Sequence, residues 1–109
     1  MNSRDTQILK KILDETKIAL DMVEDISKEG FLEDEKLKRA VCMTLINIGE
    51  LVKNITAETK ELYSYVPWRE ISGLRDMAAH KYQTLRMEDV FTTATIDLPD
   101  LKRDITGIL

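Results

Sequence analysis

The sequence predicts an all-α protein, built as an antiparallel bundle of four or five helices. Apolar residues recur with the period of an amphipathic helix along most of the chain. A sustained alternation of apolar and polar residues is absent, and so are the Asn-Gly and Asp-Gly dipeptides that are typical of tight hairpin turns. The length of 109 residues suits one domain, which we expect to span residues 1–109.

The first helix is expected over about residues 4–28. Gly30 is expected to end it, because a left-handed cap costs glycine less than any other residue. The side that faces the core carries Leu9, Ile12, Leu13, Thr16, Leu20, Val23 and Ile26.

The second helix is expected over about residues 33–57, and it has apolar residues on two sides. Cys42, Met43 and Ile46 lie opposite the main stripe, among charged residues. A helix with two apolar sides needs two burial partners, so we expect the second partner to be another subunit. The main stripe consists of Leu37, Val41, Leu45, Ile48, Val52 and Ile55.

The remaining chain predicts two further helices after a weaker stretch at 58–66. Pro67 suits the first turn of a helix, where its missing N–H costs nothing, and a short connection follows at 83–86. A last helix begins at Met87, and Pro99 should bend or divide it. Gly49 and Gly73 lie inside expected helices at a cost of about 1 kcal/mol each against alanine, so we expect close helix contacts at both.

Composition favours a folded cytoplasmic protein. Hydrophobic residues make up 43% and charged residues 33% of the chain, and no apolar run approaches the roughly 18 residues that a membrane span needs. The first five residues enter mixed charged sequence without an apolar signal core, so we expect no export. Cys42 is the only cysteine and His80 the only histidine, which makes a transition-metal site improbable, and no glycine-rich phosphate loop is present.

The charge balance limits the kind of nucleic-acid binding to expect. The chain has 16 basic and 20 acidic residues, for a net charge of −4. Proteins that wrap long stretches of nucleic acid usually present a basic surface, so this balance disfavours that class. A small RNA-cleaving site with a local cluster of cations remains compatible with it.

The stretch from Ile71 to Tyr82 carries the most chemical information. It contains Arg75, the single histidine His80 five residues later, and Tyr82 two residues after that. Histidine exchanges protons near neutral pH, and arginine stabilises a phosphate that gains negative charge in its transition state. Together they could support RNA cleavage without a metal, in which a base activates the 2′-OH for attack on phosphorus.

Helical geometry leaves the arrangement of these residues open. At about 100° per residue, Tyr82 falls within about 20° of Arg75, whereas His80 lies about 140° away. Either the helix ends near His80, or the site combines residues from two chains. A lone histidine near a helix end is also often a cap or a surface group, and Arg75 could equally pair with Asp76 or Glu50.

The stretch resembles the signature of the HepT-like family within the HEPN superfamily, in which arginine, four residues, histidine, one residue and tyrosine recur. Arg75, His80 and Tyr82 match it position for position. The family has a polar Asn or Asp after the arginine, and here it is Asp76, which brings negative charge near the proposed phosphate site. Supporting features cover most of the chain, namely Arg39-Ala40, Asn47-Ile48-Gly49-Glu50, Pro67-Trp68, Ile71 and Gly73.

The resemblance implies a HEPN-like bundle and the toxin component of a type II or type VII-like toxin–antitoxin pair. It implies a homodimer with Arg75 and His80 as catalytic residues at the subunit interface, and RNA as substrate of a metal-independent endoribonuclease without a cofactor. Asp76 and Tyr82 would be supporting residues. A nucleotidyltransferase antitoxin would attach AMP to Tyr82 and silence the toxin.

Two other interpretations remain open from the sequence. The chain could be a non-catalytic HEPN interaction module whose main role is to bind a nucleotidyltransferase. It could also be a helical dimer in which Arg75 and His80 are structural.

Overall fold

The computed structural model describes residues 1–80 and 82–109, without the side chains of Arg75, Met77, Ala79 and His80. The described residues form helices and no strands, so the predicted all-α class is confirmed. The elements are α1 (Ser3–Val23), α2 (Lys28–Glu33), α3 (Glu35–Lys53), α4 (Ala57–Leu62), α5 (Trp68–His80), the 3-10 helix η1 (Tyr82–Thr84), α6 (Met87–Thr92), the π-helix η2 (Thr93–Asp97) and α7 (Leu98–Ile108).

Side-chain caps fix where the first four helices begin. Asn2, Ser27, Asp34 and Thr56 each precede a helix and accept a hydrogen bond from the backbone N–H three residues later. These bonds satisfy N–H groups that have no partner inside the helix. Short polar residues therefore set four boundaries that the apolar periodicity locates only approximately.

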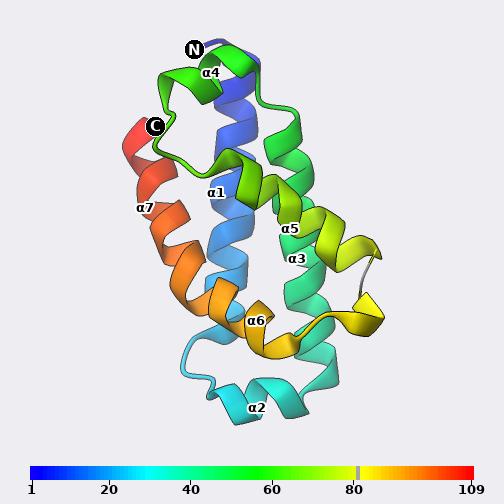
Figure 1. The fold of residues 1–109 in the computed structure, drawn as a ribbon. Coiled ribbons are helices and arrows are strands. Elements are labelled where there is room, and N and C mark those ends of the chain that lie inside the picture. Colours follow the sequence, from blue (N-terminus) through cyan, green and yellow to red (C-terminus); the bar gives the residue numbers. More distant parts are fainter. Residues whose placement is uncertain (81) are drawn as a thin grey trace.

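The four longer helices, α1, α3, α5 and α7, form the bundle. α1 and α3 run antiparallel, and the short helix α2 connects them at one end of the molecule (Figure 1). α5 crosses α3, while α7 packs along α1 on the other side, with α4 at the opposite end from α2 (Figure 1). No helix within the described part of the chain is long and apolar enough to cross a membrane.

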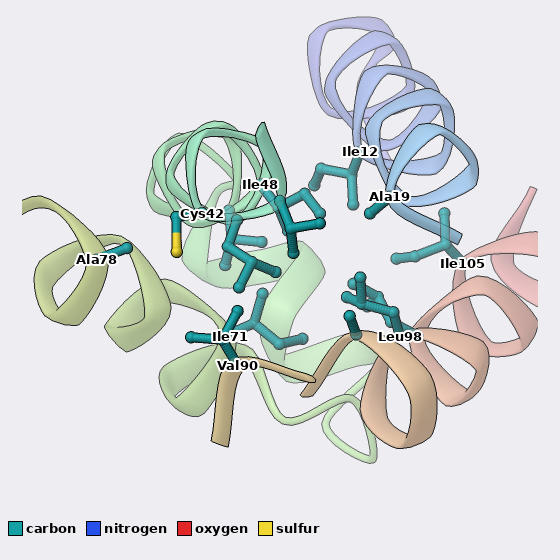
Figure 2. Close-up of a cluster of buried hydrophobic side chains, with 14 of the residues drawn as sticks. Ile12, Ala19, Cys42, Ile48, Ile71, Ala78, Val90, Leu98 and Ile105 are labelled. Carbon is teal, nitrogen blue, oxygen red and sulfur yellow. The ribbon is translucent and has the colours of Figure 1, made fainter. Parts of the chain in front are cut away.

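The core lies between these helices, and α3 is buried from two directions. Ile48 faces α1 near Ile12, whereas the thiol of Cys42 lies between α3 and Ala78 of α5 (Figure 2). Cys42 is thus covered by the same chain, and the expectation that its side of α3 needs another subunit is wrong for this residue. Met43 remains 56% exposed.

The first helix ends earlier than predicted. α1 stops at Val23, the chain turns through Asp25 with a φ of 59°, and Gly30 lies inside α2 instead of ending a helix. An aspartate tolerates the left-handed region better than most residues, so the turn forms without glycine. Ile26, expected in the core stripe, consequently lies beyond α1 and is 37% exposed.

The last helical segment is divided, as Pro99 predicts. α6 begins at Met87, and the π-helix η2 separates it from α7. Pro99 lies in the first turn of α7, where its missing N–H is tolerated, and the N–H of Leu98 reaches back to the carbonyl of Thr93. The π turn thus lies just before the proline.

The two glycines that were expected inside helices, Gly49 and Gly73, differ in their surroundings. Gly49 is buried on α3, in agreement with a packing role. A Cβ atom added at Gly73 would meet nothing within 4 Å in the part of the chain that the structure describes, so the prediction of a close helix contact there is wrong for these residues.

Candidate functional site

α5 carries the Arg75–His80 segment, and its first turn is anchored firmly. The carbonyl of Pro67 accepts a hydrogen bond from the N–H of Ile71 at 3.1 Å, so the proline immediately precedes the first turn. Trp68 is buried, and its Nε1 donates to the carbonyl of Tyr63 at 3.1 Å. Ile71 and Ala78 face the core and hold the helix against α3.

Arg75 and His80 both belong to α5, which ends at His80. The helix thus ends at the histidine, which is one of the two alternatives that the sequence left open; the other, a site shared between two chains, stays open. The side chains of Arg75 and His80 lie outside the described residues, so their predicted joint action on one phosphate stays a prediction. Because both positions lie within α5, helical periodicity separates their directions by about 140°.

Asp76 pairs with a lysine from the neighbouring helix. Lys53 Nζ, at the last turn of α3, lies 3.1 Å from Asp76 Oδ1. Both side chains are partly exposed, at 38% for Lys53 and 57% for Asp76, so the pair contributes about 0–1 kcal/mol to stability. Its electrostatic effect matters more here, because the ammonium group offsets the negative charge that Asp76 brings beside Arg75.

Tyr82 packs against the edge of the hydrophobic core, and the side chain of Arg39 covers its ring. The Arg39 guanidinium lies over the Tyr82 ring, 5.2 Å from its centroid, and also contacts Glu35 Oε1 at 3.2 Å. The Tyr82 ring is half-buried. The angle of about 20° between Arg75 and Tyr82 holds only for an unbroken helix, whereas α5 ends at His80 and Tyr82 begins η1.

Two cations that the motif does not include therefore lie beside it. Arg39 and Lys53 come from α3, far from the motif in sequence, and contact Tyr82 and Asp76. Their spacing of fourteen residues puts them within about 40° of each other on the helix. The sequence could have indicated that Arg39 and Lys53 share one side of this helix, but it did not show which other helix that side would face.

The described part of the site contains no obvious metal centre. Within the described residues, no three His, Cys, Asp or Glu side chains come together as a group that could hold a metal ion. Burial raises the pKa of the Cys42 thiol, which keeps this nearby nucleophile protonated.

The fold and the motif together define a class, namely a small helical bundle whose motif helix, α5, ends in an arginine–histidine segment followed by a tyrosine. The chain belongs to the ribonuclease HepT-like family of the HEPN superfamily, whose family model matches residues 12–108.

Individual relatives agree with the family match. The chain is 38% identical over 101 residues to "Putative RNase TTE0752" of Caldanaerobacter subterraneus subsp. tengcongensis, covering 93% of this chain and 90% of that protein. It is 34% identical over 97 residues to "Probable ribonuclease HepT" of Thermococcus cleftensis, covering 85% of this chain and 88% of that protein. No solved structure matches the chain.

Proposed function

We propose that this protein is a metal-independent endoribonuclease and the toxin of a toxin–antitoxin pair. In this proposal Arg75 stabilises the phosphate and His80 exchanges protons, at a site completed by a second copy of the chain. One observation carries the most weight. This chain belongs to the ribonuclease HepT-like family, and it has Arg75 and His80 on one helix, α5, which ends at the histidine.

The geometry of α5 supports a site that two copies share. Positions 75 and 80 point about 140° apart on one helix, so a single α5 does not direct both at one phosphorus atom. Position 73 lies two turns before position 80, on nearly the same side of the helix. The bare backbone at Gly73, with nothing within 4 Å of an added Cβ, leaves room for a second chain or a substrate to approach.

The charges around α5 also support phosphate binding. Lys53 offsets Asp76 at 3.1 Å, so the acidic residue beside Arg75 does not act as an isolated negative charge. Arg39, with 64% of its side chain exposed, adds a second cation near the end of the motif. Lys53 is paired with Asp76 and Arg39 with Glu35, so these four charges cancel and Arg75 would supply the net positive charge for a phosphate.

The proposed reaction is an internal phosphoryl transfer in the RNA, from the 5′-oxygen of the leaving nucleotide to the neighbouring 2′-oxygen. A base removes the proton from the 2′-OH, the 2′-oxygen attacks the adjacent phosphorus, and the 5′-oxygen leaves and takes up a proton. The products are a 2′,3′-cyclic phosphate and a 5′-OH end. Arg75 would stabilise the extra negative charge on the phosphate oxygens in the transition state.

The proposed regulation involves Tyr82. A nucleotidyltransferase antitoxin would bring ATP to the tyrosine, whose oxygen attacks the α-phosphorus, releases pyrophosphate and loses its proton. The half-buried ring under Arg39 fixes the position of this tyrosine, since a guanidinium over an aromatic face is an attractive contact. AMP on Tyr82 would then add negative charge beside the RNA site.

The central experiment is incubation of the purified protein with RNA in EDTA, beside His80→Ala. We expect cleavage by the parent and a loss of at least about 10²-fold in the variant, because proton transfer typically contributes 10²–10⁴-fold. The products should carry 2′,3′-cyclic phosphate ends. Gln83→Ala is the matched control, because Gln83 is exposed and close to the motif in sequence.

The outcomes separate the interpretations. Circular dichroism melting should show that His80→Ala remains folded. Equal cleavage by parent and variant would indicate a contaminating nuclease. No cleavage by either, with firm binding to a nucleotidyltransferase, would refute the enzyme and favour an interaction module.

A further inference from the structure

A groove opens between α5 and the η2–α7 segment, on a different side of α5 from the Lys53–Asp76 pair. It exists because α5 packs mainly against α3, whereas α7 packs against α1, so the two helices diverge (Figure 1). The cavity has a volume of about 320 Å³. Its apolar floor comes from both walls, with Ile71 and Leu74 on α5 and Leu98 and Leu101 on α7.

Carboxylates border this floor on both sides. Glu70 lies on α5, while Asp97, Asp100 and Asp104 follow one another at helical spacing along the opposite wall. Asp100 is paired with Arg103 at 2.7 Å, but Glu70, Asp97 and Asp104 have no ion-pair partner among the described residues. Among the described residues that line the groove there is no lysine or arginine.

These features favour one kind of occupant. The carboxylates do not form a group that could hold a metal ion within the described residues, and they would repel the phosphates of RNA. The volume is at the small end for ligand pockets, which suits a few inserted side chains better than a large cofactor. An apolar floor with an acidic border matches apolar side chains flanked by lysine or arginine.

We propose that this groove is a docking site for a basic amphipathic helix of a partner protein. Leucine-type side chains of that helix would enter the cavity over Leu74, the partly exposed residue of the floor, and its lysines or arginines would pair with Glu70, Asp97 and Asp104. Burial of the apolar side chains provides most of the affinity, while the charges orient the partner and increase the rate of encounter. This surface is independent of the proposed ribonuclease site.

The test uses a labelled synthetic helical peptide with leucines one turn apart and lysines on either side. Fluorescence anisotropy should show saturable binding that weakens with added salt, because screening shortens the range of the charges. The double variant Asp97→Lys/Asp104→Lys should bind about tenfold more weakly, since two attractive pairs become repulsive. Asp21→Lys/Glu24→Lys is the matched control, because it makes the same charge change at exposed positions near the end of α1.

A second peptide, with serine in place of leucine, tests the apolar floor and should bind much more weakly. Amide chemical shifts of the parent protein should change along α5 and α7 on addition of the first peptide. If the double variant does not fold, Glu70→Lys tests the opposite wall, and it too should bind the first peptide more weakly.

Absence of saturable binding, equal binding by both peptides, or equal weakening by the control would overturn the proposal. Dissociation of a parent homodimer by the groove variants would assign the groove to a second copy and likewise overturn it.

Discussion

Asp5 is a buried carboxylate that joins the start of α1 to the start of α4. Its side chain is 0% exposed, and its oxygens accept hydrogen bonds from the Thr56 hydroxyl at 2.5 Å, the Thr59 hydroxyl at 2.6 Å and the Thr56 N–H at 3.3 Å. Thr59 is also buried, so its hydroxyl has little access to water if the carboxylate is removed. We therefore predict that Asp5→Ala is strongly destabilising.

The expected magnitude follows from these contacts. Hydrogen bonds to a charged group contribute about 1.5–3 kcal/mol each, and removal of one partner leaves buried donors unsatisfied. The desolvation of the carboxylate offsets part of this gain, which leaves a net loss of about 3 kcal/mol for Asp5→Ala. For a domain of this size the melting temperature should fall by roughly 12 °C. Asp5→Asn keeps one acceptor oxygen and should lose about half as much.

The same site predicts a pH dependence. Burial raises the pKa of Asp5, but the hydrogen bonds from Thr56 and Thr59 outweigh it and hold the pKa below its ordinary value of 3.8. A carboxyl group whose pKa is lower in the folded than in the unfolded state stabilises the fold at every pH above the unfolded-state pKa. This contribution is lost as the pH falls through the folded-state pKa. Asp5→Asn should therefore show less loss of stability than the parent on acidification below about pH 4.

The assay is urea unfolding of the parent, Asp5→Ala and Asp5→Asn at neutral and acidic pH. Asp34→Ala is the control, because Asp34 is an exposed cap that accepts one bond from the Leu37 N–H at 3.0 Å, and its loss should cost only about 1 kcal/mol. If Asp5→Ala costs no more than this control, the reasoning from burial and hydrogen bonding is refuted.

Two further predictions concern the thiol and the assembly. The Cys42 thiol, 3% exposed and with a pKa raised by burial, should react with Ellman's reagent far more slowly in the native protein than in urea, and immediate reaction of the native protein would contradict this. Light scattering at micromolar concentration should give twice the mass of the 12.6 kDa chain, because Met43 is exposed on α3 and the backbone at Gly73 is uncovered. A mass of 12.6 kDa would exclude a site shared between two copies.

Much of the fold was accessible from the sequence, because local periodicity records which side of each helix is buried. The all-α class, the helix start at Met87 and the division of the last helix near Pro99 all follow from short-range patterns. The Arg75–His80–Tyr82 motif also required no structure, since its residue types and spacing lie within one short segment. The early end of α1 at Val23 was missed because Asp25 makes its turn without a glycine.

Periodicity does not record which neighbour covers a given side, and packing alone decided this. The second apolar side of α3 indicated another subunit, yet Cys42 is buried against α5 of the same chain. The pairing of Lys53 with Asp76 likewise joins residues 23 positions apart, because α3 and α5 lie against each other. Sequence thus determined the helical class and the chemistry of the motif, whereas tertiary contact determined the charges around it, since electrostatic interactions depend on distance in space and not along the chain.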